Sequence, residues 1–411
     1  MSSVKLIINF WSRKGVDMRL FLLFVIVAQG FGADWFNMNP DPHPSARQDG
    51  HLAYDAESGV VILFGGHPDG RECWAYDLSN NSWRRMSDAP VSMAFHALAY
   101  DSAYDRVIAF YGGRTLVYDY NNDFWEDMNP NPAPKAKWGA MLAYDIESGK
   151  LILYGGGDVS GGQYFSYDDT WYYDYGTNTW TLLDTAGPPC REYAAMAYDA
   201  ESDLIILFGG EYNGNQGFLD DTWVYDYNSN TWIEMNPAQS PTERRLHGMV
   251  YDASRDRVVL YGGQGGSWDT WEYDYNSDTW EEIVTNNHPN ARSNVGMAYH
   301  RGENRVVLFG GQYYATYYDE TWIYPDPLGI SHFRTDRTRM IRVSPNPFRK
   351  QIRIYGSGGK RIAVFDVQGR PIAQISGSTW SGNDISGIEV GPGIYFLMIE
   401  GLQPVKVVKI R

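Results

Sequence analysis

A pair of adjacent glycines recurs six times along this 411-residue chain, and it restricts the possible folds more than any other feature. The spacings between successive pairs are 47, 43, 54, 53 and 48 residues. Each pair follows a short aliphatic run, which is typical of a buried strand, and glycine suits a close approach of another backbone. The pairs are Gly65-Gly66, Gly112-Gly113, Gly155-Gly156, Gly209-Gly210, Gly262-Gly263 and Gly310-Gly311. Such self-similarity indicates a repeat architecture.

The same order of elements surrounds each pair. A strand ending in Tyr-Asp precedes it in five repeats, and Tyr299-His300 is the sixth copy. A strand with Trp and Tyr-Asp follows, and in four repeats a second Trp comes nine residues after the first. Leu116 replaces the first Trp in the second repeat. With Asn-rich turns that suit hairpins, each repeat reads as four strands, a to d, which is one blade of a β-propeller.

The ends of the repeat region predict how the ring closes. The sixth repeat has no second Trp after Tyr324, whereas the segment Asp34–Pro40 matches the sequence that begins at Trp232. We therefore expect the strand at Trp35 to complete the last blade, giving six blades of which five are continuous and one is split. Closure of this kind removes an open sheet edge, which would otherwise invite aggregation.

Glycine pairs after apolar strands, with a Trp/Tyr pair and a spaced second Trp, resemble the Kelch repeat. The resemblance covers residues 33–324 and implies an all-β, six-bladed Kelch-type propeller. Kelch propellers include a copper radical oxidase, sugar-acid epimerases and many interaction modules. The resemblance therefore predicts fold much better than activity.

The N-terminus predicts export. Basic residues precede the eight-residue apolar run Leu20–Val27, and small residues follow it, as in a secretory signal peptide over residues 1–32. Met18 is an alternative start, and a membrane anchor is the alternative reading, although a spanning helix needs about 20 apolar residues.

The C-terminal region differs in composition. Residues 33–324 carry 17 basic and 43 acidic residues, a net charge of −26, whereas residues 341–411 carry 10 and 4, a net charge of +6. We expect a linker over 325–340 and a small Ig-like β-sandwich over 341–411. The segments Ser344–Phe348, Phe365–Arg370 and Gly391–Phe396 look like the type IX secretion C-terminal sorting domain. That resemblance implies recognition by the type IX secretion machinery and a secreted or outer-surface location in a Gram-negative-type bacterium. A plain Ig-like binding module is the alternative.

Several classes of function are disfavoured. A net charge of −16 argues against nucleic acid as a partner. The usual motifs of zinc proteases, serine hydrolases and dinucleotide binding are absent, so we expect no cofactor, no metal and no assigned catalytic residue. The acidic pairs Asp168-Asp169 and Asp220-Asp221 could bind Ca²⁺ through their carboxylate oxygens, so a calcium site remains an alternative. His96 and His247 share one repeat position, and we expect both to be strand residues with satisfied hydrogen bonds.

The loops of one face are the candidate site. Counted from the glycine pair to the first Trp, or to Leu116 in blade 2, the b-to-c connections have 7, 2, 14, 12, 7 and 10 residues. Function usually lies on variable loops of a rigid scaffold, which favours the face of the b-to-c and d-to-a connections. A basic residue recurs seven positions before the strand-a Tyr, with Met93 in its place in blade 2. It could bind a carboxylate, or pair with an acidic residue such as Asp221. These candidate ligand-binding residues are Arg47, Lys137, Arg191, Arg244 and Arg292, to which we add the loop aromatics Tyr164, Tyr212, Trp268 and Tyr313.

The sequence thus predicts a monomeric, exported recognition module for a glycan or a protein, and an enzyme is disfavoured. The alternative is a sugar-acting enzyme, such as an epimerase, lyase or oxidase, with its site at the channel mouth. A structural or adhesive surface role without a discrete ligand is a third possibility.

Overall fold

The computed structural model describes residues 34–135, 138–212, 217–264 and 268–325, together with strands between 342 and 409. The chain divides into two compact units, Met1–Ser331 and His332–Arg411. The predicted signal peptide and all of the predicted linker except Pro325 lie outside the described residues. No helix occurs in the described part, and hence none there that is long and apolar enough to cross a membrane.

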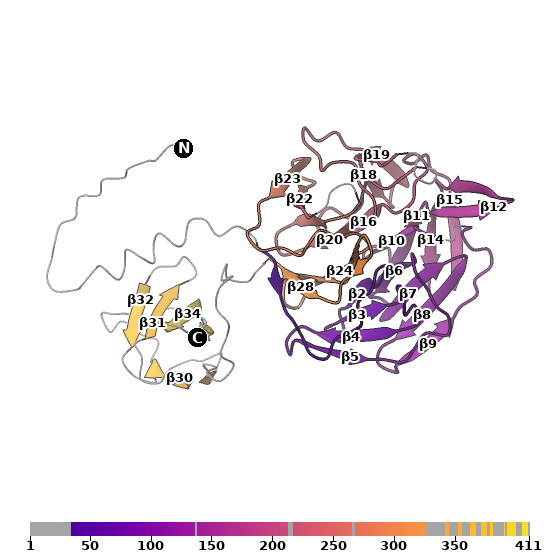
Figure 1. Ribbon diagram of the computed structural model, residues 1–411. Coiled ribbons are helices and arrows are strands. Elements are labelled where there is room, and N and C mark those ends of the chain that lie inside the picture. Colours follow the sequence, from indigo (N-terminus) through magenta and orange to yellow (C-terminus); the bar gives the residue numbers. More distant parts are fainter. Residues whose placement is uncertain are drawn as a thin grey trace. The chain divides into compact units, whose positions relative to one another are not determined.

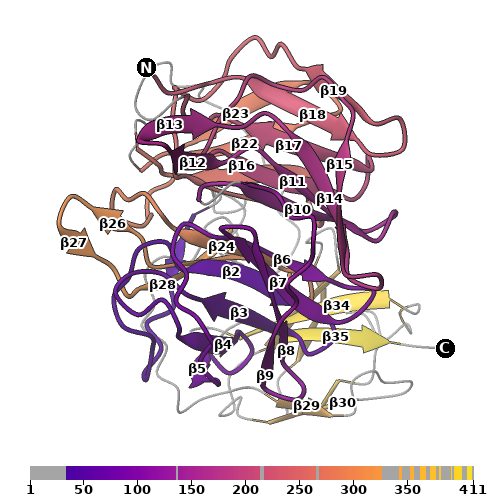
Figure 2. The same ribbon diagram turned by 90° about the vertical axis from the view of Figure 1, so that its right-hand side faces the viewer.

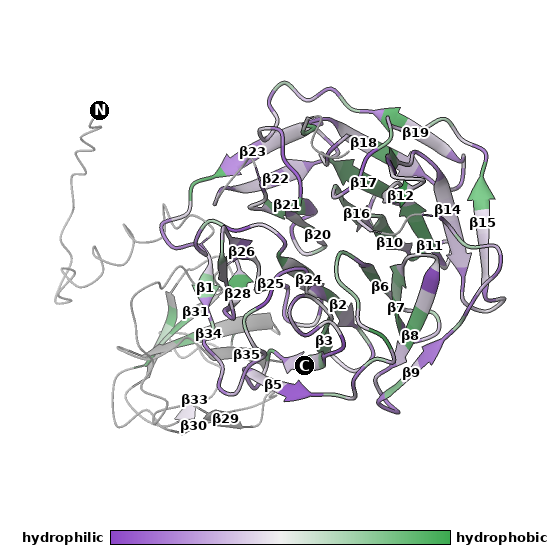
Figure 3. Cartoon of the chain, turned by 45° about the vertical axis from the view of Figure 1, so that its right-hand side comes forward, coloured by the Kyte–Doolittle hydropathy of each residue, from purple (hydrophilic) through white to green (hydrophobic). Residues whose placement is uncertain are grey.

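The first unit is a ring of six antiparallel four-stranded sheets (Figure 1). In each blade, strand a lies nearest the centre of the ring and strand d lies at its outer edge (Figure 3). Strands a to d of blades 1 to 3 are β2 (His51–Asp55), β3 (Val60–Phe64), β4 (Cys73–Asp77) and β5 (Ser82–Arg85); β6 (Ala97–Asp101), β7 (Arg106–Tyr111), β8 (Arg114–Asp119) and β9 (Phe124–Asp127); and β10 (Met141–Asp145), β11 (Lys150–Tyr154), β14 (Thr170–Asp174) and β15 (Thr179–Leu183). Those of blades 4 to 6 are β16 (Ala195–Asp199), β17 (Leu204–Phe208), β18 (Thr222–Asp226) and β19 (Thr231–Glu234); β20 (Gly248–Asp252), β21 (Arg257–Tyr261), β22 (Thr270–Asp274) and β23 (Thr279–Ile283); and β24 (Gly296–His300), β25 (Arg305–Phe309), β28 (Thr321–Tyr324) and β1 (Phe36–Asn37). The predicted six-bladed, all-β propeller is confirmed.

The N-terminal segment closes the ring as expected. Strand β1 pairs antiparallel with β28, so that Phe36 lies opposite Ile323 and Asn37 opposite Trp322. Trp35, directly before β1, is fully buried and packs on the rings of Tyr261 and Tyr324 at centroid distances of 5.0 and 4.9 Å. The split sixth blade is therefore confirmed.

Apolar side chains fill the interface between each blade and the next. The second strands are the most buried, since every residue of β3 is inaccessible to solvent or nearly so. Their hydrophobic colouring contrasts with the polar outer strands β5 and β9 (Figure 3). The second Trp of a blade adds a polar link, because its indole N–H donates to a Thr in the first two residues of strand c of the preceding blade. Blade 1 has Cys73 at the position of that Thr, and Trp125 donates to the carbonyl of Ser87 instead.

The recurrent Tyr of strand c fixes the turn that follows it. In blade 4 the Tyr225 hydroxyl donates to the side chain of Asn230, at 2.9 Å, and Asn230 has a φ of 52°. Asn and Asp tolerate this left-handed conformation better than other residues. The equivalent pairs are Tyr76 with Asn81, Tyr118 with Asp123, Tyr173 with Asn178 and Tyr273 with Asp278. The Tyr of the strand-c motif therefore stabilises the turn that follows it.

The second unit contains two antiparallel sheets. One contains β29 (Arg342–Ser344), β30 (Ile352–Tyr355) and β33 (Thr379–Trp380). The other contains β32 (Pro371–Ile375), β31 (Ile362–Asp366), β34 (Gly393–Ile399) and β35 (Val405–Lys409). That these strands form an Ig-like sandwich with a sorting role stays a prediction.

Candidate functional site

The b-to-c and d-to-a connections lie on one face of the propeller, which we call the loop face. Two hairpins project from it: β12 (Gly157–Ser160) with β13 (Gln163–Ser166) in blade 3, and β26 (Gln312–Tyr313) with β27 (Thr316–Tyr317) in blade 6. Figure 2 shows both on the same side of the propeller. The longest connections therefore gather on the face that loop length indicated.

The four described arginines of the candidate set are buried in their own blades. Arg191, with no exposed surface, donates to both carboxylate oxygens of Asp221 at 2.6 and 2.7 Å, and to the carbonyl of Gly209 at 3.0 Å. Asp221 also accepts the indole N–H of Trp223 at 2.7 Å. Arg244 pairs with both oxygens of Asp269 in the same way, whereas Arg47 donates to one oxygen of Glu72 and Arg292 to one oxygen of Glu320; all three also donate to the carbonyl of a paired glycine. Each guanidinium thus ties a loop to a glycine pair and to the following strand.

These pairings follow the alternative that the sequence left open, in which each arginine pairs with an acidic residue before the Trp strand. Met93, which replaces the arginine in blade 2, is buried as well. Lys137 lies outside the described residues. That the arginines also contact a ligand stays a prediction.

The four candidate aromatics are exposed on the loop face. The exposed fractions are 39% for Tyr164 and Tyr212, 60% for Trp268 and 48% for Tyr313. Trp268 packs on His288 at a centroid distance of 6.0 Å, and Tyr313 packs edge-on against Tyr314 at 4.6 Å. Aromatic rings of this exposure, held by hairpins and by neighbouring rings, suit contact with another molecule.

A buried carboxylate holds Tyr164 in place. Glu192, which has no exposed surface, accepts hydrogen bonds from the Tyr164 hydroxyl at 2.6 Å and from the indole N–H of Trp138 at 2.8 Å. Burial raises the pKa of Glu192, and the nearby Glu211 carboxylate raises it further. Glu211 forms an ion pair with Arg245, whose guanidinium lies 5.3 Å from the centre of the Phe218 ring. The hairpin of blade 3 is therefore anchored to the loops of blades 4 and 5.

Six residues line the mouth of the central channel, one from each blade. They are Asp49, Phe95, Gly139, Tyr193, Leu246 and Asn294, and all have φ between 54° and 62°. Five hydrogen bonds of 2.8–3.1 Å link the backbones of these residues around the ring. Such left-handed conformations cost free energy for residues other than Gly, Asn and Asp, and they cluster at functional positions. We call this set the channel ring.

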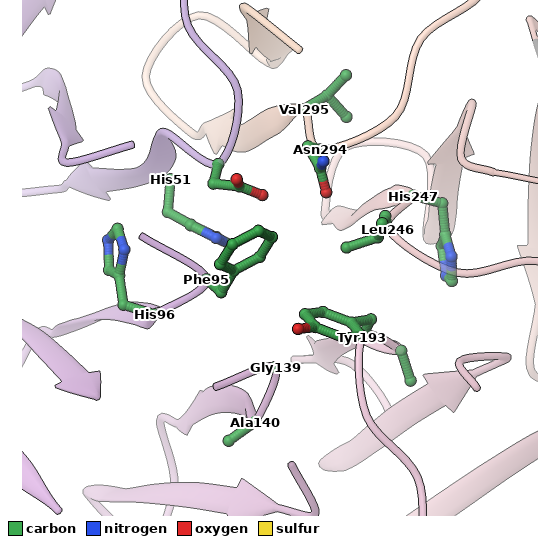
Figure 4. Close-up of a pocket in the computed structure, with 12 residues that line it drawn as sticks. His51, Phe95, His96, Gly139, Ala140, Tyr193, Leu246, His247, Asn294 and Val295 are labelled. Atoms are coloured by element: carbon green, nitrogen blue, oxygen red, sulfur yellow. The ribbon is translucent and has the colours of Figure 1, made fainter. Parts of the chain in front are cut away.

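The channel ring encloses a cavity of about 60 Å³ (Figure 4). Phe95 and Tyr193 form its aromatic wall, with centroids 5.6 Å apart and rings inclined by 70°. Gly139 permits this contact, because a Cβ there would lie 2.9 Å from the Tyr193 ring. Asp49 and Asn294, which we call the polar wall, also line the cavity, and so does His51.

The polar wall contains unsatisfied acceptors. One carboxylate oxygen of Asp49 and the amide oxygen of Asn294 are buried without a hydrogen-bond partner. Only 3% of Asp49 and 7% of Asn294 is exposed. Burial raises the pKa of Asp49 to about 8. A buried carboxyl group without a counter-charge favours its neutral form, so this wall is suited to a positively charged or donating group.

His96 differs from the expectation for it. It precedes β6 instead of lying in the strand, and neither ring nitrogen has a hydrogen-bond partner. Its ring packs on His51 and Phe64 at centroid distances of 4.7 and 5.0 Å. Burial, and then the His51 charge, lower its pKa well below the usual value. His96 therefore acts as an apolar ring. His247 likewise precedes its strand, β20, and has no hydrogen-bond partner at either ring nitrogen, so the expectation of satisfied hydrogen bonds was wrong for both histidines.

The channel ring was missed at the level of sequence. Its residues stand two positions before strand a in every repeat, but their side chains differ in size, charge and polarity. These six positions share one backbone conformation but carry different side chains, so they form no recognisable sequence motif. The signal that could have found it is the contrast between this variable position and the regular pattern around it. Among the described residues, no group of three or more His, Cys, Asp or Glu side chains is placed to hold a metal ion.

Comparison with known proteins agrees with the repeat. Residues 114–311 match the model of the KLHDC2/KLHL20/DRC7 Kelch-repeats domain. The chain is 22% identical to Kelch domain-containing protein 3 of Homo sapiens over 232 residues, which are 50% of this chain and 58% of the relative. It is 26% identical to tRNA wybutosine-synthesizing protein 4 of Eremothecium gossypii over 191 residues, which are 43% of this chain and 26% of the relative. The chain thus spans little more than half of the first relative and about a quarter of the second.

Kelch propellers typically serve as protein-interaction modules. The recurrent glycine pairs, the six four-stranded blades and the matched domain lead to one conclusion: the first unit is a six-bladed β-propeller, and its residues 114–311 match a Kelch-repeats domain.

Proposed function

We propose that this propeller is a recognition module that docks a protein partner on its loop face. The observation that carries the proposal is the set of exposed aromatic side chains on that face, above all Trp268, which is 60% exposed. Aromatic anchors of this kind provide most of the binding energy in many protein interfaces. The arginine pairs and the Glu192 contacts support the proposal because they fix the loops that present these rings, which lowers the entropy lost on binding.

We also propose where this module acts, from the sequence motifs at the two ends of the chain. The residues resembling a secretion signal and a type IX sorting domain support export through the type IX route, with display on the outer surface or release from it. A secreted module would meet its partner outside the cell or at the surface. The export part is tested separately, by asking whether removal of residues 341–411 leaves the protein inside the outer membrane of a host that has this secretion system.

A glycan is the second candidate ligand, and Trp268 favours it. A single indole exposed beside a second ring, His288, offers a flat surface on which a sugar ring can stack. An enzymatic role would require reacting groups that converge on one bound substrate, and product release from any bound sugar would reveal it.

The test compares two aromatic residues of equal exposure. Trp268 and Phe124 are both 60% exposed, but Phe124 lies in β9, at the outer edge of its blade. The full-length chain is cross-linked to proteins of the cell surface and secreted fraction, and it is also screened on a glycan array. We expect Trp268→Ala to abolish a specific cross-link that Phe124→Ala retains. Equal cross-linking by both variants would contradict docking on the loop face, and loss of a glycan signal in Trp268→Ala alone would establish the glycan instead.

A further inference from the structure

The channel cavity combines features that together select for one kind of group. Two aromatic rings, Phe95 and Tyr193, and the buried polar residues Asp49 and Asn294 line it. Asp49 carries the only carboxylate among the residues that line it. The faces of aromatic rings carry negative electrostatic potential, so both walls favour a cation.

We propose that the channel cavity takes the side-chain ammonium group of a lysine from a protein partner. The inference rests on the proposed function, because it assumes that a protein docks on the loop face above the channel. The ammonium group would lie beside Asp49 as a counter-charge for its buried carboxylate, and its adjoining methylenes would contact Phe95 and Tyr193.

The dimensions and charge of the cavity discriminate among alternatives. Its volume of about 60 Å³ suits a compact ammonium group better than the larger planar guanidinium of arginine. A carboxylate or phosphate would face Asp49 with like charge. A metal ion needs several converging ligands, and among the described residues no group of three or more His, Cys, Asp or Glu side chains is placed to hold one. The net charge of −26 over residues 33–324 would attract a basic partner from solution.

Binding would be linked to the release of a proton. With a pKa of about 8, Asp49 is mostly neutral at pH 7, and an ammonium group beside it would favour the ionised carboxylate. The other titratable groups that border the cavity are His51, His96, His247 and Tyr193. Burial lowers the pKa of each histidine and raises that of Tyr193, so none of them changes charge between pH 6 and 9. Affinity should therefore rise about tenfold per pH unit up to pH 8, and then level off until the lysine itself loses its proton near pH 10.

The experiment needs no identified partner. The full-length chain is titrated calorimetrically with N-acetyl-lysine N-methylamide, with the norleucine analogue, which lacks the ammonium group, and with the arginine analogue. We expect the lysine probe to bind at least about tenfold more tightly than either analogue, since each tenfold step is 1.4 kcal/mol. Asp49→Asn should remove this preference, and Asp41→Asn, which alters an exposed carboxylate, should retain it.

A second measurement uses the unmodified chain, and so does not depend on whether Asp49→Asn folds. Titration in buffers of different ionisation enthalpy should show release of about one proton per bound lysine probe at pH 7. Equal binding of the lysine and norleucine probes, or no proton release, overturns the proposal. If the Trp268-dependent cross-link persists in that case, protein docking on the loop face survives and only the lysine assignment fails. If the unsubstituted chain forms no cross-link that depends on Trp268, the proposed function fails together with the lysine assignment.

Discussion

The indole N–H of Trp35 donates a 2.9 Å hydrogen bond to the hydroxyl of Thr270, although 235 residues separate the two in sequence. Thr270 opens strand c of blade 5, and Trp35 occupies the position that the second Trp holds in a continuous blade. The same donor and acceptor recur where Trp83 meets Thr321, and where Trp180 meets Thr115. Closure of the ring therefore uses the same chemistry as the contacts between continuous blades.

Removing the side chain of Trp35 should strongly destabilise the propeller. Trp35→Ala leaves a cavity beside Tyr261 and Tyr324, and losses of about 3–5 kcal/mol in the free energy of unfolding are usual for such a change. Deletion of residues 33–40 should have at least the same effect. Chemical denaturation of the full-length chain measures it, with Phe36→Ala as the control because that ring is 38% exposed. An unaltered midpoint for Trp35→Ala would contradict closure through β1.

The contribution of the Trp35–Thr270 hydrogen bond to stability can be measured separately from the packing of the Trp35 ring. Thr270→Val keeps the side-chain volume but leaves the Trp35 N–H buried without an acceptor, which costs about 1–3 kcal/mol. In the double variant with Trp35→Phe, the donor is also gone, so the effect of Thr270→Val should largely disappear. A double-mutant cycle measured by denaturation gives this coupling directly. Additive effects of the two substitutions would show that the hydrogen bond contributes nothing.

The sequence predicted the scaffold well and the channel poorly, for a physical reason. Residues such as Trp83 and Gly209 repeat because every blade faces the same packing and backbone requirements, and repetition makes them visible. Side chains in the channel meet around one axis, and each can differ from the others without disturbing the blades. Asp49 and Tyr193 belong to different repeats, so only the closed ring shows that they border one cavity.

The recurrent arginines have a structural role. Arg47 and Arg244 occupy one repeat position, for which the sequence left two interpretations open: binding of a ligand carboxylate, or pairing with an acidic residue of the same face. In the structure both are fully buried and paired with Glu72 and Asp269. A residue that recurs in nearly every blade meets a structural requirement that all blades share. A ligand bound on the channel axis instead contacts positions whose side chains differ from blade to blade.

Replacing His96 by an apolar ring should not lower the stability of the fold at neutral pH. Since neither nitrogen has a hydrogen-bond partner and the ring packs on Phe64, His96→Phe should change the free energy of unfolding at pH 7 by less than about 1 kcal/mol, or increase it. Burial lowers the pKa of His96 in the folded state, so the unfolded chain binds more protons below pH 6.5 and stability is lost as the pH falls. His96→Phe should therefore flatten the decline in melting temperature between pH 6.5 and 4. Denaturation across that range measures it, and an unchanged slope would show that His96 is not buried as described.

Asp49 should make the stability of the fold depend on pH in the opposite direction to His96. Its pKa is about 8 in the folded state, against a usual value of 3.8, so the folded chain binds more protons between those values. Stability contributed by the neutral carboxyl group is present below pH 4 and is lost as the pH rises through 8. Asp49→Asn removes this loss, and we expect it to raise the free energy of unfolding at pH 8.5 by at least about 1 kcal/mol relative to the unsubstituted chain, since one pKa unit corresponds to ~1.4 kcal/mol. At pH 4.5 the two proteins should differ much less. Asp41→Asn, at an exposed position, should leave the melting temperature nearly unchanged at both pH values. Saturating the protein with the lysine probe at pH 8.5 should narrow the gap between Asp49→Asn and the unsubstituted chain, because only the latter then gains a counter-charge for its buried carboxylate.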